Sequence, residues 1–397
     1  MDEQLLSNSS RVLEKSHIQK ALQSPLTSDT ISFALGMPAT NLLPLDKYKT
    51  ALDKILSSTS LQYSPHVKAL KAQIVDLMKE RQVFCNQDQI FLTSGAQQAM
   101  MLITKLLVDK GDDIIIEEAT YPGFIQIAKS LQANLITIPS DHQNGILIEE
   151  LENYLKIKNQ KKPKFIYTIP EGHNPLGMSL SKEKRLKLIN LAESYKIPIV
   201  EDDAYGFINY EEEVKPPLRA YSDEWIFYIG SFSKILSPST RVGWIIVPEV
   251  LIEKLEILKE ASDINTATFS QHIISSYIEM DFLSDHLSLI KKHYKEKRDT
   301  MAKALKQYIP EMQFIIPNSG FFIWGRLPKH IDTNKLFKLA LETKNVSFLP
   351  GSAFGPNNKN NLTNCLRLSF AFCPLDKIEI GIKRLSQAVK LLENGVV

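Results

Sequence analysis

The sequence has little of what marks secreted, metal-binding or membrane proteins. Its three cysteines, Cys85, Cys365 and Cys373, are odd in number and lack the spacing of a metal site, which predicts free thiols in a reducing compartment and no bound metal. No apolar run approaches the about 18 residues of a membrane-spanning helix. The first residues carry neither the basic nor the apolar region of a secretory signal. We therefore expect a cytoplasmic protein without a membrane partner.

An excess of charge of one sign is also missing. Lys and Arg number 47 against 45 Asp and Glu, so no net field attracts nucleic acid or an anionic membrane. A small-molecule partner is the better expectation. The composition is that of an ordinary globular protein, and 397 residues allow two or three domains at about 150 residues each.

What the sequence does contain is an alternation of short apolar runs with helical patterns, which begins near residue 89. Continuous apolar strands separated by helices are typical of a mainly parallel sheet covered on both faces, with its ligand site at the carboxyl ends of the strands. The predicted fold class is therefore α/β, with a seven-stranded sheet in a large domain. The predicted strands are 90–93, 114–117, 135–138, 165–169, 197–201, 225–229 and 244–247.

The C-terminal third indicates a second, smaller domain. A long amphipathic pattern over residues 285–308 predicts a helix that joins the two domains. Beyond it, an α+β domain is predicted, with strands at 314–316, 321–324 and 366–370 and helices near 334–343 and 375–393. The predicted division is an N-terminal arm at 1–44 that is part of the small domain, a large domain at 45–284 and the small domain at 285–397.

One lysine lies among small hydroxyl residues, between the last two predicted strands of the large domain. An amine in a partly desolvated, cation-rich pocket loses basicity, so Lys234 is able to form an imine with an aldehyde. Ser231 and Ser233 are donors for a phosphate, and Arg241 is a bidentate clamp for the same group. Aldehyde chemistry beside a phosphate anchor indicates pyridoxal phosphate. The alternative, a solvated surface lysine, is the commoner meaning of an isolated S-x-S-K motif.

Two earlier strand ends carry residues that suit the same cofactor. Gly95, Ala96 and Gln97 open an apolar helix, where backbone N–H groups and the helix dipole favour a phosphate. Tyr121 follows the next strand, and its ring is able to stack on a flat cofactor. Each has a plainer alternative, namely a strand-to-helix turn for the first group and a core or rim tyrosine for the second.

Two later strand ends add an amide and carboxylates. Asn174 lies in a rigid turn, where its side chain is able to bond a phenolic oxygen. Asp202 and Asp203 compete for another role, because a buried carboxylate beside a pyridine nitrogen holds that nitrogen protonated and makes the ring an electron sink. The carboxylate without this role is expected to be solvated. Tyr205 follows in the same turn.

Together these motifs resemble those of the class I/II aminotransferases of fold type I, over residues 31–372. The sequence is most similar to the branch that includes aminoadipate and kynurenine aminotransferases and the effector domains of some bacterial transcription regulators. Near the C-terminus, Asn364-Cys365-Leu366-Arg367-Leu368-Ser369-Phe370 matches the family's N-x-L-R-L-S-F. The resemblance implies a pyridoxal 5'-phosphate enzyme that moves an amino group from an L-amino acid to a 2-oxo acid, with 2-oxoglutarate as the acceptor.

The resemblance also implies roles for individual residues. The implied catalytic residues are Lys234 as the Schiff-base lysine, Asp202 on the pyridine nitrogen, and Tyr205, which shares the ring oxygen with Asn174. The remaining implied cofactor contacts are Tyr121 stacked on the ring, and Gly95, Ala96, Gln97, Ser231, Ser233 and Arg241 around the phosphate.

Substrate and subunit contacts follow from the same resemblance. Arg367 is implied to bind the substrate α-carboxylate, with Asn174 and Gly36 as further substrate contacts. Tyr63 is implied to reach the cofactor phosphate of a neighbouring subunit. The expected assembly is therefore a homodimer with shared active sites.

Two alternatives to an aminotransferase remain open. A C–S β-lyase or amino-acid decarboxylase shares the fold, and a product assay distinguishes them. A non-catalytic effector-binding domain binds the same ligands without turnover. Proteins of that kind carry a DNA-binding domain ahead of the enzyme-like part, and the segment before residue 31 is too short and too weakly basic for one.

Departures from the family pattern concern the substrate. Gln19 stands where aminoadipate-type members have an arginine, so we expect apolar or aromatic donors to serve at least as well as aminoadipate. The segment after Tyr63 is shorter than in the family. Ser319 replaces a glycine and Leu176 replaces a threonine, and we expect both changes to reshape the pocket wall.

Overall fold

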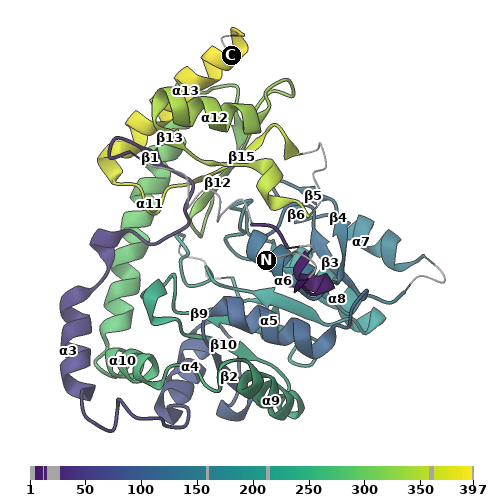
Figure 1. Ribbon diagram of the computed structural model, residues 1–397, viewed down its shortest axis with the longest axis vertical. Helices are drawn as coiled ribbons and strands as arrows, with labels where there is room; N and C mark the ends of the chain where they lie inside the picture. Colours follow the sequence, from purple (N-terminus) through teal and green to yellow (C-terminus); the bar gives the residue numbers. More distant parts are fainter. Residues whose placement is uncertain are drawn as a thin grey trace.

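The computed structural model describes residues 5–11, 13–15, 27–157, 161–211, 215–356 and 362–395. A large central sheet lies between layers of helices, and a smaller sheet with its own helices lies above it in the view of Figure 1. Within the described ranges, no helix combines the length and apolarity that crossing a bilayer would require.

The central sheet confirms the predicted strands. Among the described residues it has seven strands, all of which run parallel to their neighbours except β10, which pairs antiparallel with both β9 and β2. In spatial order they are β2 (Ile90–Thr93), β10 (Gly243–Ile246), β9 (Ile226–Ser231), β8 (Ile199–Asp202), β7 (Phe165–Thr168), β3 (Asp113–Glu117) and β4 (Asn134–Ile138).

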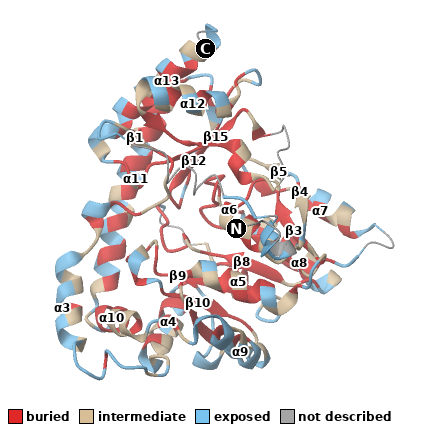
Figure 2. Cartoon of the chain, viewed as in Figure 1, coloured by how far each residue is buried: buried red, intermediate tan, exposed pale blue. Residues whose placement is uncertain are grey.

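Helices cover both faces of this sheet because its strands are apolar on both sides. Ile114 and Ile116 pack on one face, whereas Ile115 packs on the other, as the two-residue period of a strand requires. Figure 2 shows the strands between them as a buried layer. One face carries α5 (Ala96–Leu107), α6 (Pro122–Ser130) and α9 (Ile252–Asp263). The other carries α4 (Lys68–Glu80), α7 (Ile148–Leu155), α8 (Lys182–Tyr195) and α10 (Thr268–Glu279).

The smaller sheet is antiparallel and lies next to the helix that links the two parts. Its described strands, in spatial order, are β11 (Gln313–Phe314), β12 (Phe322–Arg326), β15 (Cys365–Ser369) and β14 (Leu349–Pro350). Its helices are α11 (Phe282–Tyr308), α12 (Thr333–Lys344) and α13 (Leu375–Glu393). The predicted boundary at 284/285 therefore falls in the first turn of α11, and the division into domains stays a prediction.

The segment before the large sheet returns to the smaller part. β1 (Ile31–Ser32) pairs in parallel with β13 (Val346–Ser347), a contact between distant segments that no local pattern predicts. The chain then runs through α3 (Leu45–Ile55), at the left edge of Figure 1. Apart from short 3-10 helices, the other short elements of the described residues are α1 (Asn8–Arg11), β5 (Ser140–Asp141) and β6 (Gly145–Ile146).

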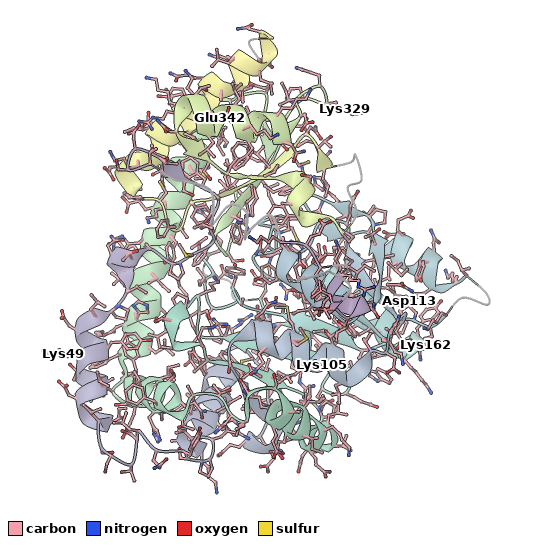
Figure 3. The ribbon with its side chains drawn as sticks, in the orientation of Figure 1. Lys49, Lys105, Asp113, Lys162, Lys329 and Glu342 are labelled. Carbon is pink, nitrogen blue, oxygen red and sulfur yellow. The ribbon has the colours of Figure 1, made fainter. Side chains whose placement is uncertain are left out.

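Charged side chains outside the core are solvated. Lys49, Lys162 and Lys329 are exposed and project from the periphery of the molecule in Figure 3. The groups of interest for chemistry are therefore the charged residues that are buried.

Candidate active site

A cavity of about 260 Å³ lies at the carboxyl ends of the parallel strands, between the large sheet and the smaller one. Every predicted site residue lines it except Gly95 and Tyr63. The predicted residues in its wall are Gly36, Ala96, Gln97, Tyr121, Asn174, Asp202, Tyr205, Ser231, Ser233, Lys234, Arg241 and Arg367. The sequence did not point to the rest of the wall, which is Ala34, Leu35, Met37, Met100, Ile169, Ala204, Pro238 and Phe322.

One end of the cavity has the features of a phosphate site. Gly95 is the N-cap of α5 with a φ of 82°, and a Cβ there would lie 2.6 Å from the Arg241 guanidinium. Arg241 donates to the carbonyl of Ser94 over 3.1 Å and to the hydroxyl of Ser233 over 3.4 Å. The Ser231 hydroxyl accepts from the Ser233 amide. A helix N-terminus, two hydroxyls and a guanidinium thus converge where an anion is stabilised.

Lys234 lies on the loop between β9 and β10, as the sequence predicted. Its Nζ donates to the carbonyl of Gly36 over 2.9 Å. Burial first, and then the positive charges of Arg367 and Arg241, lower the pKa of Lys234 to about 8. Because that pKa is close to neutrality, a usable fraction of this amine is unprotonated and nucleophilic at physiological pH.

Asp202 ends β8 with a buried carboxylate that is bound on one side only. Oδ2 accepts from the Tyr167 hydroxyl over 2.7 Å, whereas Oδ1 is buried and has no hydrogen-bond partner. Burial raises the pKa of Asp202 to about 6. An unpartnered acceptor at the floor of a pocket suits a protonated ring nitrogen, which would supply both the missing donor and the missing positive charge.

Asp203 has a different partner, and the expectation that one of the two carboxylates is solvated is wrong. Its Oδ2 lies 2.9 Å from Nη1 of Arg81 and accepts from the Tyr228 hydroxyl over 2.8 Å. Both aspartates are buried, Asp202 with 5% and Asp203 with 2% of its surface exposed. The chain turns the two side chains in opposite directions because they are consecutive residues at a strand end.

Arg367 forms the opposite pole of the cavity. Nη1 donates to Oδ1 of Asn174 over 2.7 Å, and Nη2 donates to the carbonyl of Ala34. The guanidinium carbon lies 4.2 Å from the ring centroid of Phe322 and 5.0 Å from that of Phe354. Burial lowers the pKa of Arg367 to about 10, and Nε has no hydrogen-bond partner. A buried, aromatic-clamped guanidinium with a free donor suits a carboxylate.

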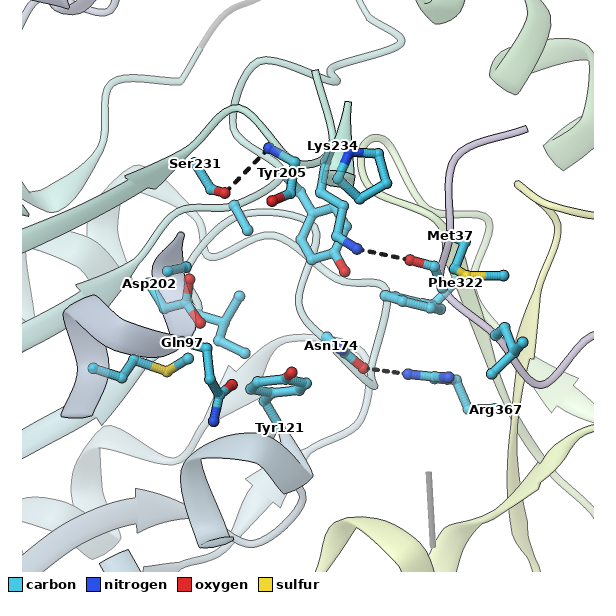
Figure 4. Close-up of a pocket in the computed structure, with 18 of the residues that line it drawn as sticks. Met37, Gln97, Tyr121, Asn174, Asp202, Tyr205, Ser231, Lys234, Phe322 and Arg367 are labelled. Atoms are coloured by element: carbon cyan, nitrogen blue, oxygen red, sulfur yellow. Dashed lines mark hydrogen bonds between the residues drawn. The ribbon is translucent and has the colours of Figure 1, made fainter. Parts of the chain in front are cut away.

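The space between these poles has aromatic and amide walls. Figure 4 shows Tyr121, Asn174, Asp202 and Tyr205 around the same opening, with Lys234 on its far side. Burial raises the pKa of both tyrosines, so each keeps its phenolic proton. The opening therefore has a flat ring, hydrogen-bond donors and a carboxylate on different sides, which fits a planar heteroaromatic cofactor.

The family model for aminotransferase class I and II matches residues 28–385. The chain belongs to this family. It is 36% identical to an aromatic-amino-acid aminotransferase 1 from Thermococcus litoralis, over 98% of this chain and 94% of that protein. A kynurenine aminotransferase from Pyrococcus horikoshii, solved with PMP, KYN as substrates and KYA as products, superposes with a TM-score of 0.92 at 34% identity and covers 98% of this chain and 97% of its own.

A third relative supports the branch that the sequence suggested. The α-aminoadipate aminotransferase of Thermus thermophilus, solved with N-(5'-phosphopyridoxyl)-L-leucine, has a TM-score of 0.90 at 30% identity, over 98% of each chain. The protein is thus a fold type I aminotransferase that moves an amino group from an L-amino acid to a 2-oxo acid. Its cofactor is pyridoxal 5'-phosphate, and the unpartnered Asp202 oxygen and the phosphate end of the cavity fit that group.

Some expectations for the aminotransferase are not met. Ser319 and Leu176 are fully buried and do not line the cavity, so the prediction that they reshape its wall is wrong. Ser319 instead donates to Glu171 over 2.7 Å, behind the turn that carries Asn174. Gln19 lies outside the described residues.

Two predicted cofactor residues lie beyond the cavity wall of this enzyme. Gly95 is directly behind the wall, against Arg241. Tyr63 is 89% exposed on the segment between α3 and α4 and does not line this cavity.

Proposed function

We propose that this aminotransferase takes apolar or aromatic L-amino acids as donors, with Lys234, Asp202 and Arg367 in the roles that the family resemblance implies. The observation that carries the proposal is the cavity itself. Its wall contains an amine of lowered pKa, a buried carboxylate and a buried guanidinium. These three groups match the ring nitrogen of the cofactor, its aldehyde and the carboxylate of the substrate, respectively for Asp202, Lys234 and Arg367.

Lys234 is the proposed acid–base catalyst. Pyridoxal 5'-phosphate supplies an aldehyde and an electron-withdrawing ring when it is bound. The Lys234 amine would hold that group by condensing with its aldehyde, with loss of water. Once displaced by the amine of the substrate, Lys234 would act as the base for the proton on the substrate Cα and then as the acid that returns it. A pKa of about 8 favours this exchange, because the amine gains and loses a proton near neutral pH.

The neighbouring residues hold the reacting groups in place. Asp202 would pair with the ring nitrogen, Tyr205 and Asn174 would bond the ring oxygen, and Tyr121 would stack on the ring. Ser231, Ser233, Arg241 and the start of α5 with Gly95, Ala96 and Gln97 hold the phosphate. Arg367, with Asn174 and Gly36, binds the α-carboxylate that every amino-acid substrate shares.

The substrate side chain meets an apolar wall. Met37 lies next to Phe322, on the side of Arg367, and Leu35 also lines the cavity. Among the described lining residues, the cations are Lys234, Arg241 and Arg367, and each already has a role in the proposal. A distal carboxylate of a donor would therefore find no cation of its own in the described wall, whereas an aliphatic or aromatic side chain would be desolvated favourably.

A donor panel tests this function. We expect phenylalanine, leucine and methionine to convert the bound cofactor to its amine form at least as fast as aminoadipate, as followed by absorbance. Oxo acids of unchanged carbon count are the expected products, whereas ammonia with a thiol, or carbon dioxide, would indicate a lyase or decarboxylase. The acceptors should include a monocarboxylate oxo acid beside 2-oxoglutarate, because the described wall gives the second carboxylate no separate cation.

Substitutions separate the proposed roles. Lys234→Ala should abolish turnover but retain cofactor, and borohydride reduction of the wild type should fix the cofactor on Lys234 alone. Arg367→Lys should lower kcat/KM for every donor by a similar factor. Met37→Ala is the matched control, and it should change the ratio of kcat/KM for phenylalanine to kcat/KM for alanine. Labelling of another lysine, or an Arg367→Lys effect confined to dicarboxylic donors, would overturn the assignments.

The proposal includes a cytoplasmic homodimer with shared sites. Tyr63 and Leu61 are 89% and 67% exposed on the same segment, as side chains that meet a second copy would be. The three cysteines are free thiols, which suits a reducing compartment. Light scattering should give a dimer, and Tyr63→Phe should weaken cofactor retention by about 1 kcal/mol. A fully active monomer at assay concentration would contradict the shared site.

A further inference from the structure

The carboxylate that faces the cofactor ring is itself held by a residue outside the cavity wall. Tyr167 donates its hydroxyl to Oδ2 of Asp202 over 2.7 Å, and neither side chain is exposed to any extent that would let water compete. Oδ1 is left as the free acceptor. One hydroxyl therefore decides which of the two carboxylate oxygens is available.

Tyr167 has no freedom to move away from this position. Phe124 stacks on its ring with 3.8 Å between centroids and 5° between planes, and Phe165 packs edge-on against Phe124 at 6.0 Å. The backbone is fixed as well, because Tyr167 pairs with Val200 in the register of β7 and β8, and Asp202 follows two residues later. A stacked ring on a central strand is a rigid mount for a hydroxyl.

We propose that Tyr167 is a positioning residue for Asp202: its hydroxyl occupies one carboxylate oxygen, aims the other at the cofactor ring and stabilises the ionised carboxylate. The inference rests on the proposed role of Asp202. It concerns a side chain that touches neither cofactor nor substrate and acts through another residue.

The charges around Asp202 explain why this donor matters. Burial raises the pKa of the Asp202 carboxyl, and the negative charge of Asp203 raises it further, whereas the Tyr167 hydrogen bond is the largest influence that lowers it. The Ala204 amide and His173 also lower it. The Lys234 amine faces Asp202 across the cavity.

The hydroxyl is a permanent donor, because burial, followed by the charge of Asp202, raises the pKa of Tyr167 well above its ordinary value. Without it, the carboxylate should bind a proton more readily. A neutral carboxyl no longer favours a protonated ring nitrogen, so cofactor affinity should fall, and fall more as the pH decreases.

The test compares Tyr167→Phe with Tyr228→Phe. Tyr228 is an equally buried tyrosine that donates over 2.8 Å to the neighbouring Asp203, on the other side of the sheet. The readout is the Kd of the cofactor-free protein for pyridoxamine 5'-phosphate, which has no aldehyde to bond with Lys234, measured by fluorescence from pH 5.5 to 8.5. We expect Tyr167→Phe to raise Kd about tenfold at pH 7 and to move the pH dependence upward by about one unit. Tyr228→Phe should leave both within about twofold of wild type.

A double variant distinguishes a specific role from general damage. In an Asp202→Asn background, Tyr167→Phe should have no further effect on Kd, because the residue it acts through is gone. Equal effects of the two tyrosine substitutions, or an additive effect in the double variant, would overturn the inference. If Asp202→Asn alone leaves Kd and its pH dependence unchanged, the proposed role of Asp202 fails instead.

Discussion

Asp202 and Asp203 are adjacent in the sequence and equally buried, yet their surroundings differ in one respect. Each accepts a tyrosine hydroxyl, from Tyr167 and Tyr228 respectively. Asp203 also forms an ion pair with Arg81, whereas Asp202 takes part in no ion pair with any described residue. A buried carboxylate that is paired with a cation of the same chain has a structural role. A buried carboxylate without such a cation is a candidate to bind a positively charged group of a ligand.

The side of the sheet that holds Asp203 also holds the cation that pairs with it. Arg81 lies 5.0 Å from the centroid of Phe207. Burial, the largest single influence, lowers the pKa of Arg81, but the charges of Asp203 and three further acidic groups together raise it. Glu201, on the same side of β8, accepts two backbone amides, and burial followed by the charge of Asp203 raises its pKa to about 7. Asp203 therefore has its cation within the chain, and the proposal assigns it no ligand.

When each aspartate is replaced in turn, the largest expected difference between the two variants is in catalysis. Asp202→Asn should lower kcat/KM by about 10²- to 10³-fold, because the ring nitrogen loses its charged partner. Asp203→Asn should leave turnover per folded molecule within a few-fold of wild type. Steady-state kinetics with circular dichroism as the fold control would measure both, and comparable losses for the two variants would erase the distinction.

The next largest effect is on the free energy of unfolding, and here Asp203 rather than Asp202 is the residue whose substitution should destabilise the protein. Asp203→Asn should destabilise the protein by about 3 to 5 kcal/mol, because Arg81 is left as a buried charge without a partner. Urea unfolding of the cofactor-free protein measures this. A loss of unfolding free energy below about 1 kcal/mol would show that the Arg81–Asp203 ion pair contributes little to stability.

A smaller expected effect is on how the stability of the cofactor-free protein depends on pH. In the cofactor-free protein the pKa of Asp202 is about 6, above its ordinary 3.8, so the folded state binds a proton that the unfolded state has lost. Stability from this group is therefore intact below about pH 4, falls as the pH rises to 6 and stays low above it. Asp202→Asn lacks this penalty and should be more stable than wild type by about 2 to 3 kcal/mol at pH 7.5, with the gain vanishing near pH 4. A variant less stable than wild type at pH 7.5 would refute this.

The smallest effect concerns the residues behind the Asn174 turn. Glu171 forms a 2.6 Å ion pair with Arg185 and accepts hydroxyls from Ser179 and Ser319. Ser319→Ala should cost about 1 kcal/mol of stability, because one of several donors is lost, and should not alter the donor preference. If the ratio of kcat/KM for phenylalanine to kcat/KM for aminoadipate changed, Ser319 would instead have a role in donor specificity.

Much of the fold was predictable because the large sheet is buried on both faces. Its strands are uninterrupted apolar runs, and each of them was found from the sequence. The pairing of β1 with β13 and the two-residue strand β14 were not, because such short elements carry no periodic pattern and depend on distant partners.

The candidate site was predictable where polar residues follow strands, as Asn174, Asp202 and Lys234 do. Tyr167 was missed because a tyrosine inside an apolar strand looks like any core residue until its hydroxyl partner is known. Phe354 and Met37 were missed for a similar reason, since apolar side chains carry no chemical signal in sequence. The choice between Asp202 and Asp203 needed the position of Arg81, which is distant in the chain.

The close packing of Gly36 restricts how this enzyme is able to evolve new specificities. A Cβ at that position would lie 2.5 Å from the ring of Phe322, and that ring is itself packed against Arg367. Any larger residue would displace the ring that orients the carboxylate anchor, so selection for activity should keep glycine there. Mutational routes to other donors should therefore lead through the adjacent Leu35 and Met37, which line the same cavity.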